Sequence, residues 1–165
     1  MFFNFKKLFM VFKKLELSCI DAIVFDFDGV LTNNMVHLDQ NGQEWVSCSR
    51  SDGLAFDVFR ELNIPVYILS TEKNLVVKAR AKKLQVPSIQ GVSDKRIALE
   101  KIVKENNFCI EKVLYVGNDL NDYRAISVSG YSACPADSHS DIKKHATYVL
   151  NTNGGMGVAR EILED

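Results

Sequence analysis

The sequence has no surplus of charge of either sign. Its 165 residues carry 20 Lys and Arg against 21 Asp and Glu, a formal net charge of −1. Binding to nucleic acid or to an anionic membrane through overall charge requires a clear excess of Lys and Arg. The near balance therefore argues against a nucleic-acid partner, and any affinity for phosphate must come from a local arrangement of residues.

Cysteine is scarce and scattered. The four cysteines form no CxxC pair and have no histidine nearby at zinc-ligand spacing: Cys19, Cys48, Cys109 and Cys134. A secreted disulfide framework or a structural zinc site would need a tighter pattern. The spacing favours reduced thiols and a cytoplasmic protein.

No apolar run is long enough to cross a membrane. The opening stretch MFFNFKKLFMVFKKLEL is apolar but is interrupted by two pairs of lysines. A membrane span needs about 20 apolar residues, and a signal peptide needs an unbroken apolar core followed by small residues. We expect residues 1–19 to form an N-terminal extension or leading helix whose aromatic side chains pack on the domain. The alternative is a weak amphipathic segment that lies on a membrane surface.

Internal repeats, low-complexity tracts and linkers are also missing, so residues 20–165 are expected to form a single domain. A nucleotide-binding module is disfavoured, because no strand is followed by a Walker-type glycine-rich loop or by GxGxxG.

Short apolar runs alternate with helical patterns along this domain. Residues 22–27 form an unbroken run rich in β-formers, typical of a strand covered on both faces in a parallel sheet. Further strands are expected at 65–70, 88–89, 112–119, 131–133 and 148–150, and helices at 52–62, 74–84, 93–107, 120–128, 140–145 and after the glycines at 154–157. The alternation predicts an α/β fold with a Rossmann-like open parallel sheet and helices on both faces.

One segment breaks this rhythm. Residues 35–47 read as two short strands around Asn41-Gly42, a pair that favours a tight hairpin turn because both residues tolerate positive φ. Ser51 and Asp52 then open the next predicted helix as capping candidates. The sequence therefore predicts a β-hairpin flap added to the parallel sheet.

Two aspartates end the first predicted strand. Asp26 and Asp28 are two residues apart, so on an extended chain both carboxylates face the same side, and Gly29 lets the chain turn away. Crowded carboxylates need either a cation between them or a proton on one of them. In open α/β sheets ligands bind at the carboxyl ends of strands, where these residues lie.

Other strand ends carry matching chemistry. Asp119 and Asp122 follow a later strand in GNDLND, and such oxygen-rich clusters suit Mg²⁺. Ser70 closes one strand with a hydroxyl, and Lys95 opens a helix, where its ammonium and the nearby amides suit an anion. Together these positions describe a site for a metal ion and a phosphoryl group.

The stretches DFDGVLT, LS, DK and GNDLND, in that order, resemble the four signatures of the haloacid dehalogenase superfamily of phosphohydrolases, and the resemblance covers residues 20–162. The short chain without an inserted cap domain, the hairpin, SDG at 51–53 and the tail GGMGVARE resemble its capless sugar-acid phosphatases. In that group, subunits form a homotetramer in which hairpins pair between chains and the glycine-rich tail reaches towards an active site.

The resemblance implies a role for each motif residue. Asp26 would be the nucleophile, and Asp28 would serve as acid and then as base. Mg²⁺ would be held by Asp26, the main-chain carbonyl of Asp28 and Asp119, with Asp122 nearby. Ser70 and Lys95 would hold the phosphoryl oxygens.

Substrate choice is predicted from three further residues. Glu72 stands where phosphatases of eight-carbon sugars commonly carry Arg, and Lys83, eleven residues on, falls close to three helical turns away. Arg160 is a candidate contact to a substrate carboxylate. These residues favour a nine-carbon ulosonate 9-phosphate, and 3-deoxy-D-manno-octulosonate 8-phosphate is the alternative. A rival of another class is a catalytically silent assembly domain, although Asp26, Asp28, Lys95 and Asp119 are all present.

Overall fold

The computed structural model of the chain describes residues 16–164. Six strands form one sheet in the order β5-β4-β1-β6-β7-β8, and every neighbouring pair is parallel. The strands are β1 (Ala22–Phe25), β4 (Val66–Leu69), β5 (Ser88–Ile89), β6 (Val113–Val116), β7 (Tyr131–Cys134) and β8 (Tyr148–Val149). The predicted Rossmann-like parallel sheet is confirmed.

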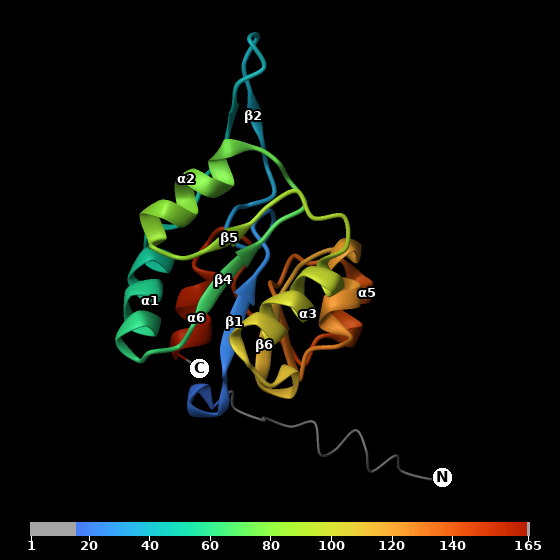
Figure 1. Ribbon diagram of the computed structural model, residues 1–165. Helices are drawn as coiled ribbons and strands as arrows, with labels where there is room; N and C mark the ends of the chain where they lie inside the picture. Colours follow the sequence, from blue (N-terminus) through green and yellow to red (C-terminus); the bar gives the residue numbers. More distant parts are fainter. Residues whose placement is uncertain (1–15, 165) are drawn as a thin grey trace.

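Helices cover both faces of this sheet (Figure 1). One face packs against α1 (Arg50–Glu61), α2 (Leu75–Leu84) and α6 (Val158–Glu164), and the other against α3 (Lys95–Asn106), α4 (Tyr123–Ile126) and α5 (Ser140–His145). Strand β1 lies between the two cores, since Phe25 faces the first and Val24 the second. Its complete burial explains the unbroken apolar run.

The hairpin is confirmed, but its turn differs from the predicted one. Strands β2 (His37–Leu38) and β3 (Glu44–Trp45) form a separate antiparallel pair that projects beyond the edge of the main sheet (Figure 1). The Asp39 carboxylate accepts hydrogen bonds from the backbone N–H groups of Asn41 and Gln43, both at 2.8 Å. These bonds shape a longer turn in which Gly42 has a positive φ of 78° and Asn41 does not. Residues 35–47 are called the flap below.

Two predicted helices begin or end elsewhere. Helix α1 begins at Arg50, and its N-cap is Ser49, whose side chain accepts from Ser51 N. The predicted helix 120–128 is instead a 3₁₀ turn, η4 (Leu120–Asp122), followed by α4. Two further 3₁₀ turns are η2 (Leu17–Cys19) and η3 (Ile110–Lys112).

The expected leading helix falls mainly on residues 1–15, which lie outside the described residues. Within residues 16–164, every helix is too short or too polar to span a bilayer. The four cysteines all have free thiols.

Candidate active site

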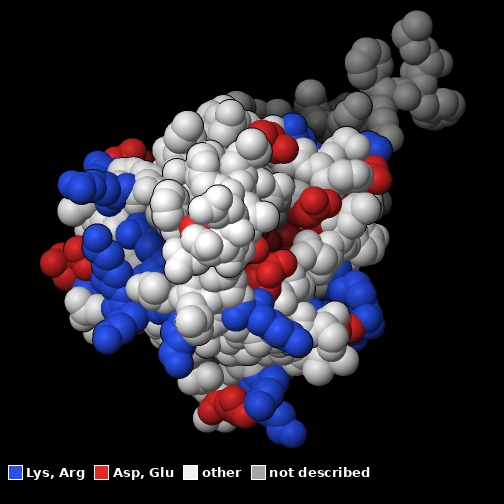
Figure 2. All heavy atoms as spheres, turned by 90° about the horizontal axis from the view of Figure 1, so that it is seen from above, with Lys and Arg blue, Asp and Glu red and all other residues white. Residues whose placement is uncertain are grey.

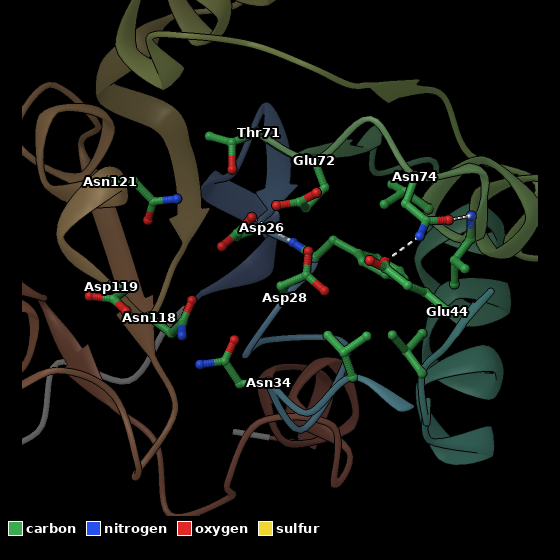
Figure 3. Close-up of a pocket in the computed structure, with 15 residues that line it drawn as sticks. Asp26, Asp28, Asn34, Glu44, Thr71, Glu72, Asn74, Asn118, Asp119 and Asn121 are labelled. Atoms are coloured by element: carbon green, nitrogen blue, oxygen red, sulfur yellow. Dashed lines mark hydrogen bonds between the residues drawn. The ribbon is translucent and has the colours of Figure 1, made fainter. Parts of the chain in front are cut away.

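The register of the two central strands brings the motif loops together. Phe25 of β1 pairs with Val116 of β6, and Asp26 N donates to the Val116 carbonyl at 2.8 Å. The loops that begin at Asp26 and Gly117 therefore leave the sheet side by side. They open into a cavity of about 480 Å³ at the carboxyl ends of the strands (Figure 3).

A buried lysine joins two of the aspartates. Lys95 Nζ lies 2.7 Å from Asp26 Oδ1 and 2.7 Å from Asp122 Oδ1. All three residues are buried. Lys95 is the first residue of α3, and the preceding Asp94 caps that helix by accepting from Arg96 N at 3.0 Å. The helix cap thus places the ammonium group beneath the cavity.

Asp122 is the centre of a buried hydrogen-bond network. Besides Lys95, its carboxylate accepts from the Tyr115 hydroxyl at 2.7 Å and from the backbone N–H groups of Asn118 at 2.9 Å and Asp119 at 3.2 Å. The sequence analysis expects Asp122 next to the metal cluster, which stays a prediction. In the structure the Asp122 carboxylate fixes the backbone of the loop that carries Asn118.

Asn118 was not among the predicted site residues, yet its side chain lies within hydrogen-bond distance of both Asp26 and the main chain of Asp28. The nearer atom of its amide is 3.2 Å from Asp26 Oδ2 and 2.9 Å from the Asp28 carbonyl oxygen (Figure 3). Either the amide nitrogen donates to both oxygens, or the amide oxygen shares a cation with them. Neighbouring oxygens around octahedral Mg²⁺, with bonds of about 2.1 Å, lie about 3.0 Å apart. The distances of the Asn118 amide from the other two oxygens therefore fit a shared Mg²⁺.

Asp119 lies differently from the other motif residues. It is exposed at the rim of the cavity, and its carboxylate accepts from Leu120 N at 2.7 Å. Its direct ligation of the metal stays a prediction. Among the described residues, no three His, Cys, Asp or Glu side chains cluster around one point, because the set above includes an amide and a main-chain carbonyl.

The carboxylates influence one another's ionisation. Burial, followed by the charge of Asp122, raises the pKa of Asp26 well above its usual value, although Lys95 opposes the rise. Burial, followed by the charge of Glu72, raises the pKa of Asp28. Burial disfavours the charge of Lys95, but the two carboxylates outweigh it and raise the pKa of the ammonium. A raised pKa suits Asp28 to donating a proton, and a cation beside Asp26 would favour its ionised form.

Of the remaining predicted residues, Glu72 lines the cavity, whereas Lys83 and Arg160 do not. Ser70 is buried at the end of β4, and its hydroxyl oxygen accepts from Glu72 N at 3.1 Å. The Glu72 side chain lines the cavity close to Asp28 (Figure 3). Lys83 in α2 and Arg160 in α6 are not among the lining residues, and Arg160 pairs with Glu164.

The flap and α2 form the outer wall of the cavity. The amide nitrogen of Asn74 donates to Glu44 in the flap, and its amide oxygen accepts from Val76 N at 3.0 Å as the cap of α2. The sequence analysis did not assign several polar lining residues to the site. Two of them, Asn118 and Asn121, lie within the GNDLND motif, and the others lie outside the four motifs: Asn34, Glu44, Thr71 and Asn74.

The acidic character of this face is visible from above. Figure 2 shows Asp and Glu side chains gathered in the hollow, while Lys and Arg side chains lie around it. Among the described residues that line the cavity, none is Lys or Arg. A substrate carboxylate that entered the cavity would thus meet amides, carboxylates and apolar groups.

Comparison with known proteins identifies relatives in sequence and in structure. The chain is 32% identical over 146 residues to 3-deoxy-D-manno-octulosonate 8-phosphate phosphatase of Salmonella typhi, covering 88% of this chain and 78% of that protein. A proposed HAD family hydrolase from Streptomyces avermitilis has a TM-score of 0.89 and 40% identity, over 91% of this chain and 92% of that one.

The Moraxella catarrhalis 3-deoxy-D-manno-octulosonate 8-phosphate phosphatase, solved in complex with a magnesium ion, a phosphate ion and a KDO molecule, has a TM-score of 0.86 and 26% identity, over 90% of this chain and 86% of that one. A sequence profile of haloacid dehalogenase-like hydrolases matches residues 71–162. With a matching profile over more than half of its length and the same parallel sheet, this chain belongs to the haloacid dehalogenase-like hydrolase family.

Proposed function

We propose that the protein is a Mg²⁺-dependent phosphatase that hydrolyses the terminal phosphate monoester of a 2-keto-3-deoxy sugar acid. The observation that carries this proposal is the buried Lys95 holding Asp26 at the end of β1, next to the Asp28 carbonyl and the Asn118 amide. A nucleophilic carboxylate, a cation site and a fixed ammonium group are the parts that phosphoryl transfer needs.

In the proposed reaction, an Asp26 oxygen attacks phosphorus while the bond from phosphorus to the sugar oxygen breaks. Asp28 donates its proton to that leaving oxygen, in agreement with its raised pKa. Asp28 then accepts a proton from the water that attacks the aspartyl phosphate, which releases inorganic phosphate and restores the Asp26 carboxylate. Asp28 is half-buried beside the cavity, where it can reach both the sugar oxygen and the water.

Bound Mg²⁺ would neutralise negative charge on the phosphoryl oxygens. We propose Asp26, the Asp28 carbonyl and Asn118 as its protein ligands, with Asp119 approaching directly or through water from the rim. Ser70 and Lys95 are proposed to contact the phosphoryl oxygens, because Ser70 directly follows β4, the neighbour of β1 in the sheet, and Lys95 pairs with Asp26.

The eight-carbon substrate, 3-deoxy-D-manno-octulosonate 8-phosphate, is better supported than the nine-carbon one favoured by the sequence analysis. The reason is that both the Salmonella and the Moraxella relatives carry the name of its phosphatase. One observation favours the nine-carbon alternative: Glu72 does line the cavity, where it can accept hydrogen bonds from hydroxyl or amide groups. Lys83 and Arg160 remain proposed contacts of lower rank, since neither lines the cavity.

A homotetramer is proposed on the basis of the flap. Leu38 and Trp45 are 68% and 62% exposed, and an isolated two-stranded hairpin is marginally stable in water. Pairing of flaps from different copies would cover these side chains. The cytoplasmic location stays a prediction from the free thiols.

A phosphate-release assay tests the proposal. The purified chain is given Mg²⁺ and, in parallel, the eight-carbon 8-phosphate and nine-carbon 9-phosphates. We expect Mg²⁺-dependent release that stops with EDTA and returns with added Mg²⁺. Asp26→Asn should abolish it without loss of folding, whereas Asp57→Asn, on exposed helix surface, should leave it unchanged.

The outcomes separate the candidates. Faster hydrolysis of the nine-carbon esters would restore the Glu72 interpretation while keeping the mechanism. Hydrolysis that persists in EDTA would contradict the metal site. No hydrolysis of any ester, from a folded protein, would favour the silent assembly domain.

A further inference from the structure

The glycine-rich turn before α6 packs against the loop that carries the aspartates. We call residues 153–157 the C-terminal turn and residues 26–34 the catalytic loop. Gly155 N donates to the Val30 carbonyl at 2.9 Å. A Cβ atom at Gly154 would lie 2.2 Å from the Gly29 carbonyl oxygen, and one at Gly155 would lie 2.5 Å from Asn33 N. The two backbones are therefore in direct contact, with no space for a side chain between them.

Gly29 is enclosed from two sides. It has a φ of 81°, and a Cβ there would lie 2.0 Å from the side-chain amide of Asn118. Gly154 contacts its carbonyl oxygen from another direction. The peptide that joins Asp28 to Gly29 carries the carbonyl facing Asn118. Any displacement of Gly29 by the C-terminal turn must move that carbonyl.

Side chains from separate segments hold the turn in place. Asp137 Oδ1 accepts from Gly154 N at 2.9 Å. Glu161 accepts from the backbone N–H groups of Asn151 at 2.8 Å and Thr152 at 2.7 Å. Asp52 in α1 accepts from Ala159 N, in the first turn of α6, at 2.9 Å. With these bonds on both flanks, the turn is a fixed support for the catalytic loop.

We propose that the C-terminal turn is a positioning element for the catalytic loop of its own chain, with Gly154 setting the place of the Asp28 carbonyl and carboxyl groups. This rests on the proposed function for the roles of Asp28. Residues of the turn are not among those that line the cavity, so Gly154 acts through Gly29 and does not touch substrate. It is a role distinct from any contact the tail makes with another subunit.

Gly154→Ala tests the close approach with little other change, because Gly154 is not among the glycines with positive φ. We expect kcat to fall at least about tenfold, because misplacing a reacting group by about 1 Å can cost a hundredfold. KM should change much less. The Mg²⁺ dissociation constant, measured by calorimetry without substrate, should rise at least about threefold, since a ligand carbonyl moves. The matched control is Gly53→Ala in α1, where the nearest side-chain atom is 4.0 Å from the new Cβ.

A second pair of variants decides the matter if Gly154→Ala fails to fold. Asp137→Ala removes the acceptor for Gly154 N and should lower kcat and Mg²⁺ affinity. Asp137→Asn keeps an acceptor oxygen and should restore both. Equal values for wild type, Gly154→Ala and Asp137→Ala would overturn the inference while the proposed function stands. An inactive wild type whose Mg²⁺ affinity still drops in Gly154→Ala would overturn the proposed function and keep the positioning role.

Discussion

Asp52 carries a buried carboxylate whose ionisation should cost stability near neutral pH. It is 1% exposed. Its Oδ1 accepts from Ala159 N, while Oδ2 has no hydrogen-bond partner among the described residues. Burial raises the pKa of Asp52 from 3.8 to about 6, although the backbone N–H groups of Ala159 and Arg160 oppose the rise. The native state therefore holds this proton more tightly than the unfolded chain does.

The size of the effect follows from the two pKa values. The stabilisation is complete below the unfolded value of 3.8 and is lost as the pH rises through about 6. The difference between the two values corresponds to about 3 kcal/mol in the free energy of unfolding. Between pH 4.5 and 7.5 the loss amounts to about 2 kcal/mol.

Asp52→Asn removes the ionisation and keeps the hydrogen bond, because the amide oxygen can still accept from Ala159 N. We expect the free energy of unfolding of the variant, relative to wild type, to increase by about 2 kcal/mol between pH 4.5 and 7.5. Urea unfolding at one fixed chain concentration measures this at both pH values. Asp57→Asn, at an exposed position of the same helix, is the control and should show no such trend. Parallel pH profiles of wild type and Asp52→Asn would refute the reasoning.

Other predictions concern the site and the assembly. Lys95→Met should abolish turnover and lower the free energy of unfolding by about 3–5 kcal/mol in urea, because it leaves the buried carboxylates of Asp26 and Asp122 facing each other. Asn118→Ala should weaken Mg²⁺ binding in calorimetry more than Asp119→Asn does, and the reverse order would make Asp119 the direct ligand. Light scattering should give a mass close to four times the 18.6 kDa of one chain, whereas an active monomer would contradict pairing through the flap.

The sequence predicted the sheet and much of the site because both follow from local patterns. The buried β1 run and the alternation of strands and helices predict a parallel sheet, and strand ends in such a sheet meet at one edge. Asp26, Asp122 and Lys95 could therefore be grouped before any coordinates, and the structure brings them within hydrogen-bond distance.

The sequence could not reveal the roles of Asn118 and Asp52, because both depend on contacts between segments that are far apart along the chain. Asn118 adjoins Asp26 because Val116 pairs with Phe25, a register that spacing along the chain does not reveal. The sequence does hint at a role for Asn118, because this residue directly follows Gly117 at the end of the strand. An Asn at that position is, however, equally typical of a helix cap. Likewise, Asp52 reads as a cap of α1, whereas its carboxylate binds the start of α6, more than a hundred residues away.

The place of Lys95 between two carboxylates also limits how such a chain can diverge. Replacing Asp26 by a neutral residue leaves the pair of Lys95 with Asp122 intact, so the fold survives while catalysis is lost. Replacing Lys95 first leaves two facing acids and endangers the fold itself. Along a lineage that abandons the reaction, Asp26 is therefore expected to disappear before Lys95, and a retained lysine in an inactive descendant would mark its enzymatic ancestry.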